Sequence, residues 1–421
     1  LKLLDYSYNF IKKIMNILYI NHYAGAPKYG MEFRPYYLAK EWIKQGHNVS
    51  IIGANFSHLR YVQPLIEKDL ENEIIEGISY YWLKTTSYNS SGIKRIINML
   101  TFVLKLNIYA KKISNQLHPD VVIASSTYPL DIYPAHKIAK MSNAKLIFEL
   151  HDMWPLSPML IGGYSENHPF IKIIQRAENY ACKNCDGYVS LLENAEHYLI
   201  EHGLKPGKFK YIPNGFSEEE WNNYLENIPT EHLALFKKLK KDNKIIIGYA
   251  GGHSSSNELN TLIESAKEIQ NKNVSFVLVG DGPLKNNLIQ KASDLKLTNI
   301  YFLPAVKKTA MPALLENFDI TFIAGIKSEL HYYGTSSNKV IDYMLAGKPI
   351  IFAVEQPNSL IEKVGCGLQI PAENKMALID TINKILDLPK EKLIEMGEKG
   401  RIYATQELNY STLAKKFIQA I

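Results

Sequence analysis

The stretch KIIIGYAGGH, residues 244–253, decides the fold, because an apolar run of strand length ends there in a glycine turn. The stretch SFVLVGDGP, residues 275–283, repeats this arrangement after an intervening helical pattern. A strand, a tight turn and a helix form the repeating unit of a parallel α/β sheet. Glycine in such a turn lets the backbone approach a nucleotide, although a tight turn also needs glycine for conformational reasons alone. The candidate nucleotide contacts in these two turns are Gly251, Gly252, Gly280 and Gly282.

The same alternation of short β-branched or aromatic runs with helical patterns extends along the whole chain in two series. In the first series we expect strands at 17–20, 49–52, 78–83, 121–125, 146–150, 187–191 and 210–212. In the second series we expect strands at 244–249, 275–279, 300–303, 320–323 and 349–353. A length of 421 residues suggests two or three domains. The sequence therefore predicts an α/β protein with two parallel sheets.

The boundary between the two series is expected near the turn signal 213–215, which precedes a polar stretch with weak strand character at 217–227. Met15 begins the first apolar run, so residues 1–14 are interpreted as an extension outside the folded body. The expected domains are 15–213 and 214–401, and residues 402–421 are expected to return to the first domain. Leu413, Phe417 and Ile421 form the helical stripe that could pack there.

Composition limits the classes of function. The chain has 48 basic and 42 acidic residues, and this net charge of +6 hints at an anionic ligand. No nucleic-acid motif accompanies it, so no nucleic-acid partner is expected. The three cysteines fit a reducing compartment, the cytoplasm, better than a disulfide framework. Cys182 and Cys185 could be half of a zinc site or a redox pair, but no second such pair exists, and buried structural thiols are favoured.

In the first domain, the informative residues follow expected strands, where ligands bind in open parallel sheets. The loop NHYAGAPKYG, residues 21–30, carries Gly25 and Gly30 and precedes a helix that contains Arg34. It could be a phosphate cradle or a flexible turn, and both readings stay open. His151 follows the strand 146–150 and is placed to contact a ligand. Asp152 could orient its imidazole or cap the next turn.

In the second domain, the richest constellation is YGTSSNKVIDYMLAGKP, residues 333–349. Ser336 or Ser337 can cap a helix whose first amides would face a diphosphate, with Lys339 as the counter-charge. Asp342 could accept hydrogen bonds from ribose hydroxyls. The alternative is a capped surface helix with an internal ion pair.

At this point the chain resembles family 4 of the retaining GT-B glycosyltransferases, particularly the branch that builds bacterial O-antigen and capsule sugars. The motifs that carry the resemblance are PDVVIA (119–124), HDMWP (151–155), IPNG (212–215), GDGP (280–283), SNK (337–339), DYM (342–344) and AGKP (346–349). The resemblance implies two facing Rossmann-like domains with a C-terminal helix that returns to the first domain. It also implies a nucleotide-sugar donor, UDP-linked, and an activity that needs no metal or other cofactor.

The resemblance assigns roles to the candidate residues. His151 matches the family's histidine in the cleft near the donor sugar and the acceptor. Residues expected at the nucleotide are Ser336, Ser337, Asn338, Lys339 and Asp342, and His151 and Lys339 are the expected catalytic residues. The implied reaction is retaining transfer, of hexosyl or N-acetylhexosaminyl type.

The sequence also departs from the family pattern. The family usually has two glutamates eight positions apart, of which Asp342 fills the second place while the first falls on Gly334. The usual Arg and Lys of the first glycine turn are absent around 251–258, so Lys339 and backbone amides are expected to carry more of the diphosphate. Two alternatives therefore remain, a GT-B sugar-nucleotide epimerase and a catalytically degenerate GT-B binding subunit.

The expected acceptor is a glycan or lipid-linked glycan at the inner membrane face. The segment 93–113 mixes apolar residues with Lys94, Arg95, Lys105, Lys111 and Lys112, as a helix in peripheral contact with a membrane would. A buried helix with a basic edge is the other reading. The expected location is thus cytoplasmic, with possible peripheral contact with the inner membrane.

Overall fold

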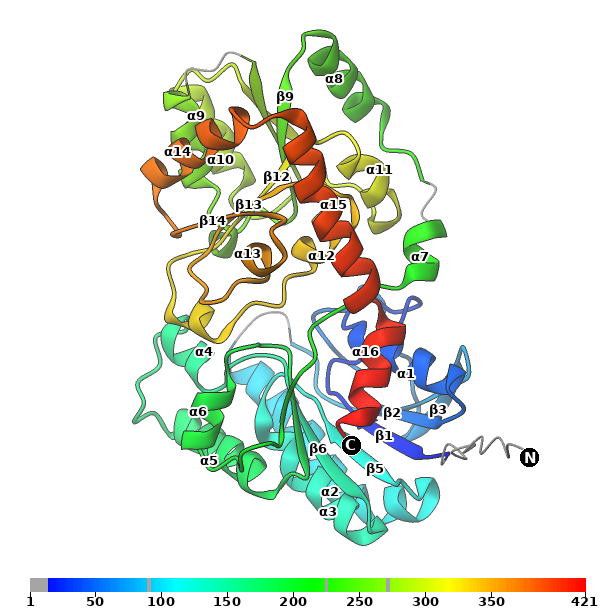
Figure 1. The fold of residues 1–421 in the computed structure, drawn as a ribbon. Helices are drawn as coiled ribbons and strands as arrows, with labels where there is room; N and C mark the ends of the chain where they lie inside the picture. The colour runs from blue at the N-terminus through cyan, green and yellow to red at the C-terminus, as the bar shows by residue number, and fades with distance from the viewer. Residues whose placement is uncertain (1–13, 89–91, 224–225, 270–272) are drawn as a thin grey trace, which may run out of the picture.

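The computed structural model describes residues 14–88, 92–223, 226–269 and 273–421. The chain forms two α/β domains, each built on its own sheet (Figure 1). All but the last residue of the expected extension 1–14 lies outside the described residues. None of the helices in the described ranges is long and apolar enough to cross a membrane.

The first sheet has eight strands in the spatial order β3-β4-β2-β1-β5-β6-β7-β8. Their bounds are β1 Asn16–Ile20, β2 Asn48–Ala54, β3 Glu71–Ile75, β4 Ile78–Leu83, β5 Val121–Ala124, β6 Lys145–Leu150, β7 Gly187–Ser190 and β8 Phe209–Tyr211. Every neighbouring pair is parallel except β3 with β4. The edge strand β3 was not expected, because its sequence ENEII has too little apolar character to read as a strand.

The second sheet has six strands in the order β11-β10-β9-β12-β13-β14, and all of its pairs are parallel. Their bounds are β9 Ile245–Ala250, β10 Val274–Val279, β11 Ile300–Leu303, β12 Ile320–Ala324, β13 Ile350–Ala353 and β14 Gly367–Ile370. Every strand expected from the sequence is present, with ends within about two residues of those expected. Strand β14 was not expected, because it is short and begins with glycine.

Helices cover both faces of each sheet. The first-domain helices are α1 Arg34–Lys44, α2 Ile93–Leu117, α3 Ile132–Ser142, α4 Leu156–Leu160, α5 Pro169–Asn184 and α6 Glu196–Glu201. The others are α7 Glu218–Asn223, α8 Thr230–Lys241, α9 Asn260–Glu268, α10 Lys285–Asp294, α11 Met311–Leu315, α12 Asn338–Leu345, α13 Leu360–Val364, α14 Lys375–Leu386, α15 Lys390–Glu407 and α16 Tyr410–Gln419. Short 3-10 turns are η1 Pro129–Asp131, η2 Ser255–Asn257, η3 Lys308–Ala310 and η4 Glu329–Tyr333.

Successive strand residues point to opposite faces, and this divides the first domain into two cores. Leu18 and Ile20 of β1 pack in the core that α2, α3 and α5 cover. Ile17 and Tyr19 pack in the other core, under α1 and α16. One side of the first sheet is therefore covered mainly by helices of the first domain, and the C-terminal helix closes the other side together with α1.

The expected return of the C-terminus is confirmed. Helix α15 packs on α12 in the second domain, and α16 continues from it along the first domain (Figure 1). Trp42 of α1 donates its indole N–H to the carbonyl of Ala414 at 3.1 Å, and its ring meets Phe417. Residues 402–407 belong to α15, so the part that covers the first sheet begins at Tyr410.

The two domains meet at the carboxyl ends of their strands. The helix α4 follows β6 and contacts η4, which follows β12. Asn194, in the loop after β7, donates its backbone N–H to the carbonyl of Tyr333 at 3.0 Å. The edges at which open parallel sheets bind ligands therefore face each other.

Candidate functional site

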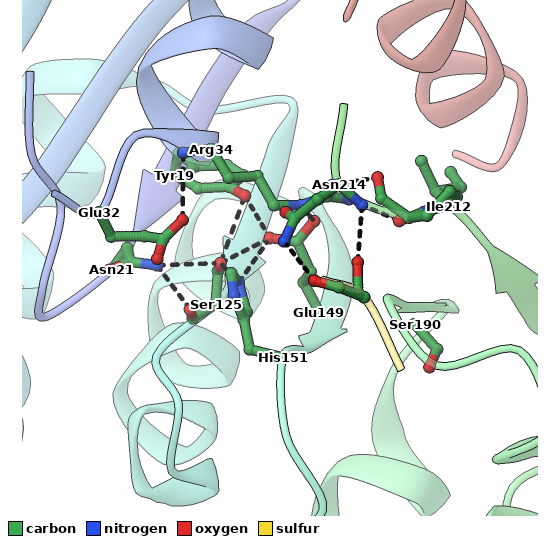
Figure 2. Close-up of polar contacts among 12 residues, drawn as sticks. Tyr19, Asn21, Glu32, Arg34, Ser125, Glu149, His151, Ser190, Ile212 and Asn214 are labelled. Atoms are coloured by element: carbon green, nitrogen blue, oxygen red, sulfur yellow. Dashed lines mark hydrogen bonds and ion pairs between the residues drawn. The ribbon is translucent and has the colours of Figure 1, made fainter. Parts of the chain in front are cut away.

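The ends of β1, β5 and β6 bring a cluster of polar side chains together with the start of α1 (Figure 2). Its centre is Glu149, a carboxylate with no exposed surface. Ser125 donates to Glu149 Oε2 at 2.6 Å, and the Tyr19 hydroxyl donates to the same oxygen. His151 Nε2 lies 3.1 Å from Glu149 Oε2 and 2.8 Å from Ser125 Oγ. The histidine is thus held at the edge of the sheet by buried partners.

Arg34 supplies the charge that balances this carboxylate. Its Nε lies 2.9 Å from Glu149 Oε1, and neither side chain is exposed. Burial alone would raise the pKa of Glu149, but the Arg34 guanidinium and hydrogen bonds from His151 and Ser125 outweigh burial and hold that pKa well below its usual range. Glu149 is therefore an anion beneath the imidazole of His151.

The same arginine also holds the linker between the domains. Its two terminal nitrogens donate to the backbone carbonyls of Ile212 and Pro213. The next residue, Asn214, donates its backbone N–H to Ser336 Oγ at 3.0 Å. A continuous chain of polar contacts therefore runs from His151, through the Glu149–Arg34 pair and the linker, to the loop before α12 (Figure 2).

The structure decides between the two roles considered for Asp152. Its Oδ1 accepts from the backbone N–H of Met153 at 2.9 Å and from the hydroxyl of Ser157 at 2.6 Å. It caps the turn into α4, while Glu149 and Ser125 contact the imidazole of His151 instead.

Gly25 and Gly30 close their loop upon itself. Gly25 donates its N–H to the carbonyl of Glu32 at 2.8 Å, and Gly30 donates to Ala26 at 2.8 Å. A β-carbon on Gly25 would lie 1.9 Å from the carbonyl oxygen of Gly30, so glycine is required for the chain to pass so closely. Because these two amides already donate hydrogen bonds within the loop, they are not available as donors to the phosphate group expected here.

The glycines of the second sheet meet Lys339. A β-carbon on Gly251 would lie 2.4 Å from Lys339 Cε, and one on Gly280 would lie 1.8 Å from the carbonyl oxygen of Gly251. A β-carbon on Gly282 would likewise come too close to the backbone of His253. The carbonyl of Gly252 accepts a hydrogen bond from the Tyr249 hydroxyl at 2.8 Å. The turns after β9 and β10 and the first turn of α12 thus form one surface, with a lysine stem lying on it.

The expected serine stands at the cap of α12 but makes no capping hydrogen bond. Ser337 occupies the N-cap position in an extended conformation, but its side chain makes no capping bond, and Ser336 Oγ accepts from the linker residue Asn214 instead. The tertiary contact between the domains takes the place of the local cap. The first amides of α12, from Asn338 onward, therefore lack a side-chain acceptor from either serine.

Lys339 and Asp342 point to different partners. Lys339 donates to Asn257 Oδ1 at 2.8 Å, and burial lowers its pKa. Asp342 lines a small cavity of about 70 Å³ between the domains, together with Asn338, Lys308 and Glu32. Burial raises the pKa of Asp342 to about 6, against the opposing effect of Lys308 and Lys339. This arrangement disfavours the surface ion pair considered from the sequence.

Gly334, which stands where the family usually has glutamate, lies at the contact between the domains. Its φ of +108° falls in the region that favours glycine, and a β-carbon would lie 3.0 Å from the backbone nitrogen of Glu193. The chain path at this position therefore disfavours the usual carboxylate side chain.

The candidate metal ligands and the thiols were also located in the structure. Within the described ranges, no cluster of three or more His, Cys, Asp or Glu side chains could hold a metal ion. Cys182 and Cys185 are buried free thiols, and burial raises the pKa of both, that of Cys185 to about 12. They pack in the core of the first domain.

Sequence reasoning missed Glu149, Ser125 and Tyr19. The available signal was the strand sequence KLIFEL, in which a single carboxylate interrupts the apolar residues of a central strand. A charge on a fully buried strand needs a partner, so this glutamate alone predicts a buried cation elsewhere in the chain. Arg34, noted only as part of the helix after the glycine loop, is that partner.

Comparison with known proteins agrees with this architecture. The model of Glycosyltransferase Family 4 matches residues 29–220, and the model of Glycosyl transferases group 1 matches residues 232–403. The putative colanic acid biosynthesis glycosyl transferase WcaI of Escherichia coli K12 is 23% identical over 403 residues, which cover 90% of this chain and 93% of that protein.

Two solved structures illustrate the likeness in fold. Anabaena Alr3699/HepE in complex with UDP has a TM-score of 0.67 at 17% identity, over 96% of this chain and 99% of that one. Sucrose-phosphate synthase from Thermosynechococcus elongatus has a TM-score of 0.67 at 15% identity, over 96% and 97% of the two chains. Two facing Rossmann-like domains, matches to both family models and a homologous transferase lead to one conclusion: the chain is a GT-B glycosyltransferase of the family 4 type.

Proposed function

We propose that this glycosyltransferase moves a sugar from a UDP-sugar to an acceptor hydroxyl, with retention of the anomeric configuration, in the synthesis of a bacterial surface polysaccharide. The observation that carries the proposal is the position of Lys339, whose side chain lies against Gly251 at the carboxyl ends of β9 and β10. Asp342 lies one helical turn later and faces the cavity between the domains.

The surroundings of Lys339 suit a diphosphate. Burial lowers the pKa of Lys339, and a bound anion beside the ammonium would raise that pKa again. Amides at the start of α12 and in the glycine turns would supply further donors, as helix N-termini do for phosphate groups. Asp342 would accept hydrogen bonds from the ribose hydroxyls.

In the proposed reaction, the bond between the anomeric carbon and the diphosphate oxygen breaks, and the acceptor oxygen bonds to the same face of that carbon. The acceptor proton passes to the departing phosphate, so no side-chain nucleophile is needed. Lys339 and the amides would stabilise the charge that grows on the leaving group. Because Glu149 anchors the imidazole of His151, that side chain would be ready to position the donor sugar and the acceptor.

The comparisons favour this donor and this product class. HepE has been crystallised with UDP and with UDP-glucose, and the printed name of WcaI refers to colanic acid biosynthesis. The same proposal includes a hexosyl or N-acetylhexosaminyl group as the transferred sugar and a glycan or lipid-linked glycan as the acceptor. It also includes a cytoplasmic site of action. We further propose that the activity needs no cofactor besides the donor.

Calorimetric titration tests the donor. We expect UDP to bind more tightly than GDP, with the same affinity in the presence and absence of a chelator. Complete loss of UDP binding on chelation would refute the metal-free proposal, and tighter binding of GDP would refute the choice of base. Screening UDP-sugars by thermal shift would then identify the transferred sugar.

A product assay separates transfer from the two alternatives. With donor alone, an epimerase would convert the sugar nucleotide without an acceptor. A catalytically degenerate binding subunit would bind UDP but release no sugar from any donor. Transfer of labelled sugar to a glycan acceptor, with release of UDP, is the expected result.

A further inference from the structure

The long helix α2 presents an apolar stripe to solvent. Its members are Ile93, Ile97, Leu100, Leu104 and Ile108, with exposed fractions between 47% and 77%. They recur every three or four residues, so they share one face of the helix. The opposite face is already satisfied, because Met99, Phe102 and Leu106 are buried in the core of the first domain. The side chains of the stripe are therefore not needed to pack the helix against the first domain.

Positive charge borders this stripe. Helix α2 has five Lys or Arg residues and no Asp or Glu. Its neighbour α3 has two lysines and no acidic residue, and α5, on the same side of the sheet, has three basic residues and one acid, the buried Glu178. The whole chain, by contrast, has 48 basic and 42 acidic residues. Carboxylates are thus excluded from the outer surface of these three helices.

Lysines lie on both sides of the stripe. By helical spacing, Lys94 and Lys112 lie along one flank of α2. Lys137 of α3 lies along the other, where it donates to the carbonyl and the side chain of Asn107. An apolar strip between lysines matches the interface of an anionic bilayer, in which acyl chains lie beneath phosphate groups. It is a poor match to a second copy of this face, because the lysines would repel one another.

An apolar groove lies between the start of α2 and the loop after β6. It is lined at the start of α2 by Ile96 and Met99 and, across the opening, by Trp154, Ile161 and Phe170. Trp154 belongs to the loop that follows β6 and begins with His151. A chain that leaves the bilayer beside α2 would therefore reach the loop that carries His151.

We propose that the outer face of α2 docks this protein on an anionic phospholipid surface and that the groove beside it receives the lipid end of the acceptor. The second part rests on the proposed function, since it states from which side the acceptor arrives. The first part stands on the exposed stripe and the charge of the helices alone.

Sedimentation with vesicles tests the docking surface on the full chain. We expect the protein to bind vesicles of phosphatidylglycerol and phosphatidylcholine, to bind pure phosphatidylcholine far less, and to be released by high salt. The double variant Leu100→Ser, Leu104→Ser should lower the partition coefficient roughly tenfold or more. Lys94→Glu combined with Lys112→Glu should abolish the preference for anionic vesicles.

The matched control is Ile394→Ser, Ile402→Ser on α15, which changes two exposed isoleucines elsewhere. It should bind vesicles as the unaltered protein does. Vesicle binding that is absent, or equal in all variants, overturns the proposal. The stripe would instead be assigned to a second copy of the chain by two results together. The unaltered protein would not bind vesicles, and light scattering would show a concentration-dependent dimer that the Leu100, Leu104 variant does not form.

UDP calorimetry on the same variants keeps this test separate from the proposed function. Unchanged UDP affinity shows that each variant is folded, so a loss of vesicle binding then reports on the surface. Failure of the unaltered protein to bind UDP would contradict the proposed donor and would leave the vesicle result standing by itself.

Discussion

Arg34 and Glu149 form a fully buried ion pair, with Arg34 Nε 2.9 Å from Glu149 Oε1. The pair joins the first residue of α1 to β6, and through Ile212 and Pro213 it also fixes the start of the linker. It therefore connects the position of His151 with the way the two domains are joined.

Removing one partner of this pair should destabilise the protein strongly. Glu149→Gln leaves the guanidinium without its anion, and we expect a loss of about 3 to 5 kcal/mol in the free energy of unfolding. Urea unfolding followed by circular dichroism measures it. A double change, Arg34→Met with Glu149→Leu, should cost less than the sum of the single changes. Additive costs would show that the two groups are not energetically coupled.

His151→Ala should reduce transfer more than donor binding. The imidazole is held beside the cleft by Glu149 and Ser125, so it would act on the reacting centre and not on the nucleotide. We expect kcat to fall by about 100-fold or more while UDP affinity changes little. Equal losses in kcat/KM and in UDP affinity would make His151 a general binding residue. His197→Ala, at an exposed histidine on α6, is the control and should leave both quantities unchanged.

Lys339→Ala and Asp342→Asn should separate the two ends of the nucleotide. Loss of the charge-assisted contact of Lys339, about 1.5 to 3 kcal/mol, should weaken UDP roughly tenfold to a hundredfold and leave uridine nearly unchanged. Asp342→Asn should weaken uridine as well as UDP, because an amide has one acceptor oxygen where a carboxylate has two. Lys384→Ala, at an exposed lysine on α14, is the control. If calorimetry finds both ligands unaffected in both variants, the donor site lies elsewhere.

Asp342 should also make nucleotide binding and stability depend on pH. Its pKa of about 6 means that the carboxylate becomes protonated as the pH falls from 7 to 5, so uridine affinity should drop over that interval. Asp342→Asn should remove this dependence. Affinity that is flat from pH 5 to pH 7 in the unaltered protein would contradict the assignment of Asp342 to the ribose.

The effect on stability has the opposite sign. A carboxyl group whose pKa is raised in the folded state binds a proton there before it does in the unfolded chain, so its contribution to stability falls as the pH rises from about 4 to about 6. At pH 7, Asp342→Asn should therefore raise the free energy of unfolding by about 1 to 3 kcal/mol. Thermal unfolding at pH 7 and at pH 4 checks this prediction. An unchanged or lower melting temperature at pH 7 would show that burial does not penalise this carboxylate.

Local patterns were enough to predict the two sheets and the return of the C-terminal helix, and they pointed to the candidate residues at strand ends. Period-two and helical apolar spacing are properties of neighbouring residues, so they are written directly in the sequence. The same holds for His151 at the end of β6 and for Lys339 and Asp342 on one short helix. Family motifs then supplied the activity, because they occur in the same order along the chain.

Only the tertiary structure decided which groups meet. Arg34 and Glu149 are 115 residues apart, and Asn214 and Ser336 are 122 apart, so no local pattern links them. The packing of the domains makes Ser336 a hydrogen-bond partner of the linker and not a helix cap. It also places Glu149 beneath His151. A charge can be buried only where the fold brings its counter-charge, and that meeting depends on the whole chain. The sequence by itself determined the elements and the chemistry they carry, and the fold decided how the charges are paired.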